Sequence, residues 1–175
     1  MPFSESNSMT FRIATTADIA PIMEIVADAQ LLLRSLGIDQ WQDGYPTSET
    51  ILGDISRSEM YVATCEEHIV AMAVISFSGE PTYRVIKGSW LNNQPYAVVH
   101  RIAVRQSAYG RNIGREILMF AEQLCHEKGI ENIRIDTHRD NLTMQHLLST
   151  SGYRHCGTIT LASGANREAY QKILQ

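Results

Sequence analysis

The chain has 175 residues, 44% of them hydrophobic, with a formal net charge of −4 at pH 7. The negative charge argues against nucleic-acid binding, because duplex-binding proteins usually present a basic face to the phosphates. Its three cysteines form no C-x-x-C pair, and neither a basic, apolar leader nor 18 consecutive apolar residues occur, so we expect no membrane contact and a cytoplasmic location.

The hydrophobic pattern predicts a single domain over residues 9–175, after a polar, flexible extension over residues 1–8. Alternating and β-branched runs predict seven strands, over 9–14, 59–65, 69–77, 96–104, 130–138, 153–161 and 167–174. Four helices are expected: one capped by Thr16 or Asp18 and ended by Gly37, and three over 47–58, 114–128 and 141–150.

Two of the predicted loops, 38–46 and 79–95, carry large aromatic residues. These residues are Trp41, Tyr45, Tyr83 and Trp90. Loops often carry binding residues, so the four rings could line a substrate pocket and hold a cation or an apolar group. The alternative is that the rings fold back onto the core. Acidic Asp43 and Glu80 in the same loops would suit a cationic amine.

The stretch over residues 98–128 combines a β-branched strand, a short loop with Gly110 and Gly114, and an amphipathic helix. Such a layout directs backbone N–H groups and the positive end of a helix dipole at one spot, which favours phosphate. Four arginines of this stretch could add phosphate contacts or could simply be solvated. They are Arg101, Arg105, Arg111 and Arg115.

This stretch, followed by I-R-I-D-T-H-R-D-N and a short helix ending in S-G-Y, resembles the GCN5-related N-acetyltransferases (GNAT) in order and spacing. The resemblance covers roughly residues 9–175. It implies an α/β (α+β) fold with a mixed, strongly twisted, mostly antiparallel seven-stranded sheet flanked by about four helices. It also implies that the central strands splay apart and that acetyl-CoA, the co-substrate, binds in the gap.

The phosphate loop of the family reads Gln or Arg, two residues, Gly, one residue, then Gly or Ala. Here the matching positions, all expected to bind the cofactor together with Arg115, are Tyr109, Gly110, Arg111, Asn112, Ile113 and Gly114. Tyr109 and Asn112 depart from the pattern. Asn enters the left-handed backbone region more readily than other residues with a Cβ, and the cradle works mainly through backbone N–H groups. We therefore expect the loop to bind phosphate despite both departures.

Direct attack by an amine on the thioester requires a proton acceptor. His100 is our candidate base, because its ordinary pKa near 6.5 suits neutral pH and arylalkylamine acetyltransferases of the same superfamily carry a histidine there. A histidine packed within the strand is the alternative. By resemblance, the backbone N–H of Ile102 stabilises the oxyanion, main-chain groups of Val104 hold the pantetheine arm, and Asn141 contacts that arm or caps its own helix.

Many members of the family carry a tyrosine general acid at the position of Leu148. That role cannot be transferred to Leu148. Tyr153, our candidate acid, is close to it in the sequence, as are His146, His138 and Cys156, which could also substitute, and a CoA thiol with a pKa near 8.5 could leave without an acid. Histidine and cysteine spacing is too irregular for a metal site, and we expect none. An exposed final strand would allow a homodimer.

We conclude from the sequence that the chain is an acetyl-CoA-dependent N-acetyltransferase that acts on a primary amine, either a small molecule or an exposed protein amine. The alternative is a non-catalytic acyl-CoA-binding or interaction module that has kept the phosphate cradle and lost the acid.

Overall fold

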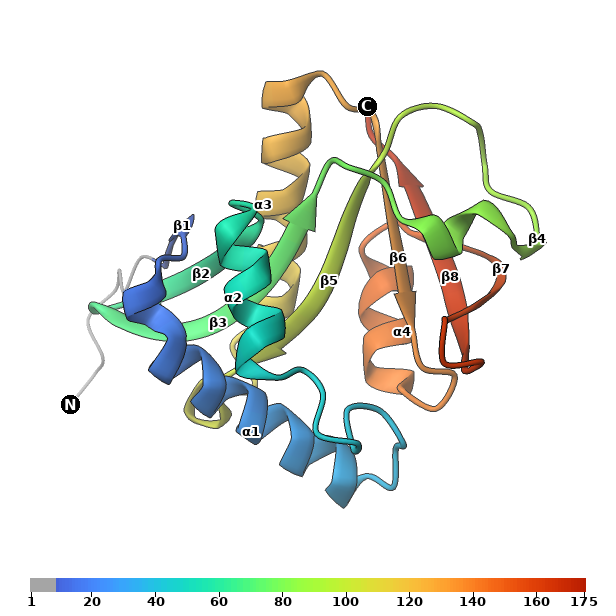
Figure 1. Ribbon diagram of the computed structural model, residues 1–175. Helices are drawn as coiled ribbons and strands as arrows, with labels where there is room; N and C mark the ends of the chain where they lie inside the picture. Colours follow the sequence, from blue (N-terminus) through green and yellow to red (C-terminus); the bar gives the residue numbers. More distant parts are fainter. Residues whose placement is uncertain (1–8) are drawn as a thin grey trace.

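The computed structural model describes residues 9–175, and the extension predicted over residues 1–8 lies outside this range. One mixed sheet runs through the molecule, with helices on both of its faces (Figure 1). The helices are α1 (Ile19–Ser35), α2 (Ser48–Ser56), α3 (Ile113–Lys128) and α4 (Leu142–Thr150). The strands are β1 (Thr10–Ile13), β2 (Met60–Cys65), β3 (His68–Ser76), β4 (Lys87–Gly88), β5 (Ala97–Val104), β6 (Asn132–Thr137), β7 (Arg154–Thr160) and β8 (Asn166–Ile173).

The predicted α/β fold class, with four helices and a mostly antiparallel sheet, is confirmed, but the described sheet has eight strands and not seven. The additional strand, β4, has two residues and lies in the segment predicted as a loop. It pairs Lys87 and Gly88 with Thr158 and Gly157 of β7. A Cβ on Gly88 or Gly157 would collide with the facing backbone, so both glycines permit this close approach. Two residues are too few to produce a periodic signal in the sequence.

The strand order is β1-β2-β3-β5-β6-β8-β7-β4, and β5 and β6 form its parallel pair. These two strands pair only through Ala97 with Ile133 and Val98 with Arg134, at the start of β5. Beyond Val98 they separate, which opens the sheet at its middle. The separation of the central strands that the resemblance implied is therefore present.

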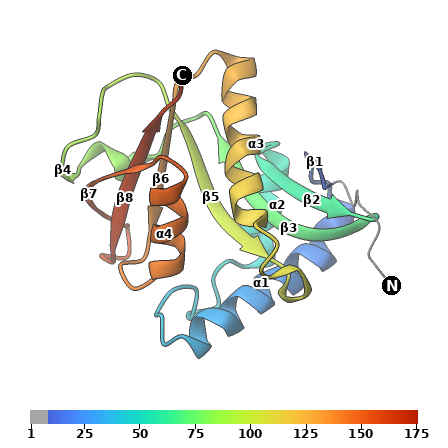
Figure 2. The same cartoon turned by 180° about the vertical axis from the view of Figure 1, so that it is seen from behind.

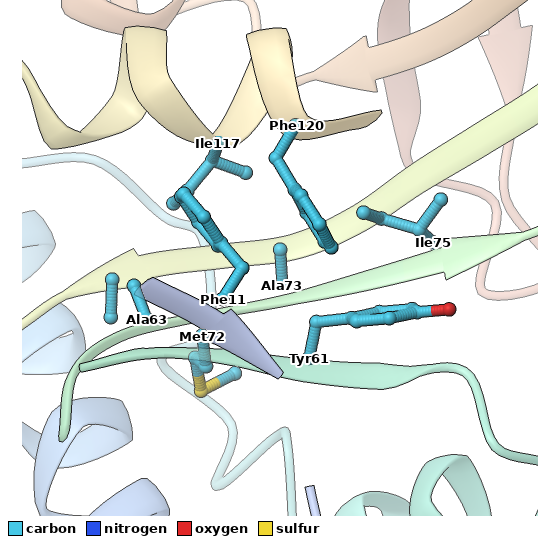
Figure 3. Close-up of a pocket in the computed structure, with 9 residues that line it drawn as sticks. Phe11, Tyr61, Ala63, Met72, Ala73, Ile75, Ile117 and Phe120 are labelled. Carbon is cyan, nitrogen blue, oxygen red and sulfur yellow. The ribbon is translucent and has the colours of Figure 1, made fainter. Parts of the chain in front are cut away.

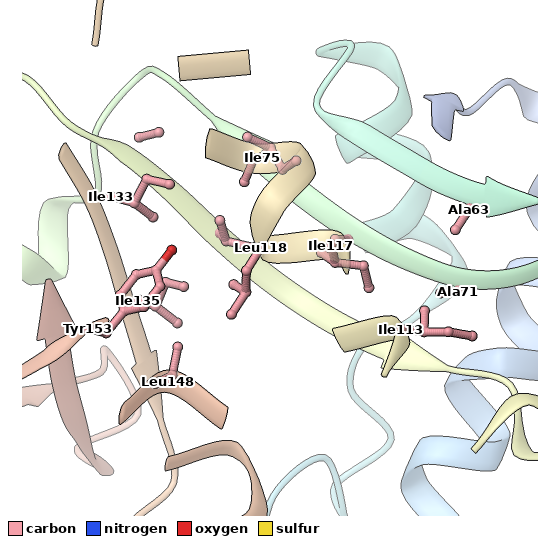
Figure 4. Close-up of a cluster of buried hydrophobic side chains, with 14 of the residues drawn as sticks. Ala63, Ala71, Ile75, Ile113, Ile117, Leu118, Ile133, Ile135, Leu148 and Tyr153 are labelled. Carbon is pink, nitrogen blue, oxygen red and sulfur yellow. The ribbon is translucent and has the colours of Figure 1, made fainter. Parts of the chain in front are cut away.

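The helices form two layers on the sheet: α1 and α2 lie over one face, and α3 and α4 over the other (Figures 1 and 2). Under α3, Ile117 and Leu118 pack with Ile133 and Ile135 of β6 in the larger core cluster (Figure 4). Under α1, Ile22 and other buried apolar residues form a separate cluster with β2 and β3. Burial of these two apolar faces fixes both layers to the sheet.

Aromatic residues at one end of the larger cluster pack without leaving room for a water molecule. Phe11 of β1 stacks on Phe120 of α3 at 4.5 Å between ring centroids, and Tyr61 meets the same ring edge-on at 5.3 Å. Figure 3 shows these three rings around Ala73 of β3. The contacts join the edge of the sheet to α3 and support no ligand site.

The last strand, β8, lies between β6 and β7, so both of its edges are hydrogen-bonded within the chain. The expectation that the final strand is exposed is therefore wrong, and this strand offers no free edge for the predicted homodimer. The order of the sheet places β1 and β4 at its two margins. Among the described helices, none has the length and apolarity needed to cross a bilayer.

Candidate active site

A cavity of about 980 Å³ lies where β5 and β6 separate. His100 and Ile102 of β5 form one wall, and Ile135 and Asp136 of β6 form the facing wall. The loop between α1 and α2 and the segment after β3 also line it, through residues that include Trp41, Tyr45, Ser78, Glu80 and Thr82. Two strands and two loops that are distant in the sequence therefore line one cavity.

The middle of β5 contains a β-bulge. Met72 of β3 pairs with Ala103 and Val74 pairs with His100, so Arg101 and Ile102 together oppose one residue of β3. Arg101 has a φ of +49°, in the left-handed region, which costs a residue with a Cβ about 1–2 kcal/mol. A bulge takes backbone groups out of the ladder and redirects side chains. The predicted base, His100, directly precedes this bulge, and the predicted oxyanion donor, Ile102, is its second residue.

His100 lies largely buried beside a carboxylate. Its Nε2 is 3.5 Å from Oε2 of Glu80. Burial lowers the pKa of His100 below its ordinary value, Arg101 acts in the same direction, and the carboxylates of Asp136 and Glu80 oppose the change. The lowered pKa favours the neutral imidazole, which is the form able to accept a proton.

Asp136 faces the cavity from β6 and accepts a hydrogen bond of 2.6 Å from the hydroxyl of Tyr83. Burial raises the pKa of Asp136, and the bond from Tyr83 limits the rise. Burial also raises the pKa of Tyr83 far above its ordinary value. The tyrosine is thus a buried donor that orients a cavity carboxylate.

Arg101 makes a network that the sequence did not reveal. Its Nε and Nη2 donate to the two oxygens of Asp54, at 2.7 and 2.5 Å, and its Nη1 donates to the hydroxyl of Tyr45 at 2.6 Å. Nη2 of Arg57 donates to the same carboxylate at 2.7 Å. Asp54 sits in α2, a predicted helix, where nothing in the local pattern distinguishes it from a solvated residue.

The four predicted aromatic residues fall into two groups. Trp41 and Tyr45 line the cavity. Tyr83 is 1% exposed, and its ring packs 5.2 Å from Trp90, whose Nε1 donates to the Tyr83 carbonyl. Among the described residues, neither Tyr83 nor Trp90 lines the cavity, so the structure supports the alternative of core packing for this pair.

The predicted phosphate loop leaves its backbone donors free from Gly110 onward, whereas the N–H of Tyr109 donates to the carbonyl of Gln106. From residue 110 to residue 115, no backbone N–H group has an acceptor among the described residues. Gly110 has a φ of +80° and Asn112 a φ of +57°, both in the left-handed region, and Ile113 begins α3. This geometry fits a phosphate group, although residues 109–115 and Val104 are absent from the described lining of the cavity.

The side chains of the arginines in this stretch differ in role. Arg105 contacts Glu24 and the carbonyl of Ile69, and Arg115 donates to the carbonyl and hydroxyl of Thr150 in α4. With Arg101 engaged by Asp54, three of the four are held by the protein. The fourth, Arg111, is exposed and has no side-chain partner in the described part of the chain.

Asn141 caps α4 and also lines the cavity. Its Oδ1 accepts from the N–H of Met144 at 3.1 Å, and its Nδ2 donates to Gln40 at 3.2 Å. The capping role expected from the sequence is therefore present. Its amide also connects α4 to the loop that carries Trp41.

Tyr153 lies elsewhere than its predicted role requires. Tyr153 is 4% exposed and belongs to the core cluster beneath α3, near Leu148 and Ile135 (Figure 4). Among the described residues 9–175, Tyr153 is not one of those that line the cavity. Burial raises its pKa well above the ordinary value, which makes it a poorer acid. The geometry gives Tyr153 no support as the general acid, and Leu148 is fully buried in the same cluster.

The chain matches the model of the acetyltransferase (GNAT) family over residues 26–153. A solved GNAT-family acetyltransferase from Streptococcus agalactiae 2603 is 34% identical, with a TM-score of 0.86 over 95% of this chain and 96% of that one. The PaiA N-acetyltransferase from Thermoplasma acidophilum, solved with coenzyme A, shares the fold at 16% identity, with a TM-score of 0.71 over 95% and 99% of the two chains. None of the curated proteins compared with the chain matches it.

The family match covers more than half of the chain, and the S. agalactiae structure extends the likeness over nearly all of it. The chain belongs to the GNAT family of acetyltransferases.

Proposed function

We propose that the protein transfers the acetyl group of acetyl-CoA to a cationic primary amine, with His100 as the general base. One observation carries the proposal: a largely buried histidine faces the cavity at the separation of β5 and β6, with its Nε2 3.5 Å from Oε2 of Glu80. A base in such a position can take a proton from an amine that enters the cavity.

The proton must be removed because an alkyl amine with a pKa of about 10.4 is neutral in only about one molecule in 2,500 at pH 7, a cost near 4.6 kcal/mol. His100 first takes one proton from the ammonium group, and the neutral nitrogen then bonds to the acetyl carbon as the carbon–sulfur bond breaks. The second proton that the nitrogen loses passes to the departing thiolate. Glu80 and Asp136 stabilise the resulting imidazolium by their negative charge. Acetyl-CoA supplies the acetyl group as an activated thioester.

The cofactor contacts in this proposal are divided among four elements. The N–H groups of residues 110–115 and the free side chain of Arg111 hold the pyrophosphate. Main-chain groups of Val104 hold the pantetheine arm, and Asn141 reaches the same arm from α4. The backbone N–H of Ile102, in the bulge, donates to the thioester oxygen.

The charge of the cavity favours a cationic acceptor. Two of the arginines that line the cavity, Arg57 and Arg101, form ion pairs with the lining carboxylates of Asp54 and Glu59. The third lining arginine is Arg167, and four other carboxylates line the cavity with it. Those carboxylates are Asp39, Asp43, Glu80 and Asp136. Trp41 and Tyr45 add ring faces that can contact an ammonium group.

We propose no protein acid for the departing thiolate. Tyr153 is in the core, and Leu148 replaces the tyrosine of many family members. A thiol with a pKa near 8.5, as in cysteine, leaves as thiolate at modest cost near neutral pH.

The test follows release of free thiol from acetyl-CoA over a panel of primary amines that includes neutral and cationic analogues. His100→Gln should lower kcat for the best amine by about 10²- to 10⁴-fold, the range for loss of a general base. His155→Gln is the matched control, because Nε2 of His155 also contacts a glutamate, Glu168, at 2.5 Å but lies outside the described lining of the cavity. Equal rates for H100Q and wild type would exclude His100 as the base.

The buried Leu148 favours a second candidate, a non-catalytic acyl-CoA-binding module. Calorimetric titration with acetyl-CoA separates the two. Tight binding without thiol release for any amine would establish the module, whereas amine-dependent release establishes the enzyme.

A further inference from the structure

Arg101 occupies the one position of β5 that lies between the proposed base, His100, and the proposed oxyanion donor, Ile102. Its left-handed φ of +49° creates the bulge that changes the register of β5 against β3. A residue with a Cβ stays in this region only when its surroundings fix it there. The contacts that hold Arg101 in this conformation therefore also position His100 and the N–H of Ile102.

Asp54 is the group that fixes it. The carboxylate receives both Nε and Nη2 of Arg101 in a two-point contact, and its side chain is 0% exposed against 16% for that of Arg101. A planar guanidinium bound at two points has a defined direction as well as a defined distance. Arg57, from the next turn of the chain, donates to the same carboxylate and limits its movement.

The contact extends to the acceptor side of the cavity. Nη1 of Arg101 donates to the Tyr45 hydroxyl at 2.6 Å, so the loop between α1 and α2 is connected through Arg101 to Asp54. One buried carboxylate in α2 thus joins the bulge of β5 to the loop that carries the cavity aromatics.

We propose that Asp54 is a positioning residue for acetyl transfer: through Arg101 it holds the left-handed bulge that places His100 and the Ile102 N–H. The inference rests on the proposed function and adds a requirement to it. Asp54 acts through the guanidinium and takes no part in proton transfer.

The test is a double-mutant cycle on kcat with Asp54→Asn and Arg101→Gly. Asp54→Asn should lower kcat by about tenfold to a hundredfold, as small misplacements of reacting groups do, and change the KM for acetyl-CoA little. In the Arg101→Gly background the same change should alter kcat by less than about twofold, because the contact it removes is already gone. Equal losses in both backgrounds would overturn the proposal.

Two further variants separate positioning from general destabilisation. Arg101→Ala should lose more kcat than Arg101→Gly, because glycine enters the left-handed region without the Cβ penalty; the reverse order would contradict the role of the bulge. Asp18→Asn is the matched control, since Asp18 holds Arg12 through a similar two-point contact away from the cavity. It should lower the melting temperature and leave kcat unchanged.

The backbone of residue 101 in crystal structures of wild type and Asp54→Asn gives a readout that needs no turnover. If wild type acetylates no amine, the proposed function fails, while the hold on the bulge is still judged by these structures. Loss of the left-handed conformation at residue 101 in Asp54→Asn would support the positioning role of Asp54, and an unchanged bulge would overturn that role. Should Asp54→Asn not fold, the Arg101→Gly and Arg101→Ala pair decides the question alone.

Discussion

Nε2 of His100 lies 3.5 Å from Oε2 of Glu80, so the middle of β5 is joined to the segment that follows β3. The other oxygen of Glu80 accepts hydrogen bonds from the N–H and the hydroxyl of Thr82, which orients the carboxylate. Its charge therefore acts on the imidazole from a fixed place and favours the protonated form.

The pH dependence of kcat/KM should report this contact. Burial places the pKa of His100 below its ordinary 6.5, so activity that depends on the neutral base should be lost only at a pH below that value. Glu80→Gln removes a charge that raises this pKa, so the acidic limb should move to still lower pH. The same amine is used for both enzymes, and the ratio of the two profiles cancels the ionisation of the acceptor.

Glu59→Gln is the control for this shift. Glu59 also lines the cavity, but its carboxylate contacts Arg57 at 3.0 Å and does not contribute to the pKa shift of His100. Its acidic limb should coincide with that of wild type. A limb that stays in place or moves to higher pH in Glu80→Gln would contradict the assigned base.

Asn112 should be replaceable by glycine but not by alanine. Its φ of +57° places it in the left-handed region immediately before α3. The left-handed conformation costs alanine about 1–2 kcal/mol. If the loop then leaves its binding conformation, the dissociation constant for CoA should rise by roughly five- to thirtyfold. Asn112→Gly should bind CoA within about twofold of wild type by calorimetry. Weaker binding by the glycine variant than by the alanine variant would refute this explanation of the loop.

Much of the fold was predictable because long periodic segments carry their own signal. The β-branched run of β5, the amphipathic pattern of α3 and the capping asparagine Asn141 each led to an element with closely matching ends. The two-residue β4 gives no such signal, since it depends on the close approach that Gly88 and Gly157 allow. The interior position of β8 was also hidden, because strand order is set by long-range pairing.

The candidate site was predictable where function follows the backbone. The phosphate loop and His100 lie on one continuous stretch, so their spacing indicated them. Asp54 lies 47 residues from Arg101 in the sequence, and only the fold brings the two together. Tyr153 is close in the sequence to Leu148, where many family members carry the acid, but its side chain lies in the core beneath α3, a position that sequence spacing does not reveal.

The two tryptophans offer a direct test of which aromatic residues meet the acceptor. Trp41 lines the cavity, whereas Trp90 packs on Tyr83 and lies under the guanidinium of Arg134, 4.2 Å from its ring centroid. Trp41→Ala should raise the KM for a cationic amine about two- to thirtyfold, the range of a lost cation–π contact. Trp90→Ala should instead lower the free energy of unfolding by about 3 kcal/mol in urea titrations and leave that KM unchanged. A selective KM effect from Trp90→Ala would restore it to the acceptor site.

Tyr153 can be tested as an acid by removing only its hydroxyl. This hydroxyl is buried and has no hydrogen-bond partner among the described residues. A buried, unpartnered polar group costs about 1–3 kcal/mol of desolvation, so Tyr153→Phe should leave the free energy of unfolding equal or raise it by about 1 kcal/mol. Because the ring also lies off the cavity, kcat and its pH profile should not change. Tyr45→Phe is the contrasting variant: it removes the hydroxyl that accepts from Arg101 and should raise the KM for the amine. A large loss of kcat in Tyr153→Phe, with stability retained, would show that the hydroxyl reaches the reacting atoms and would return Tyr153 to the role of general acid.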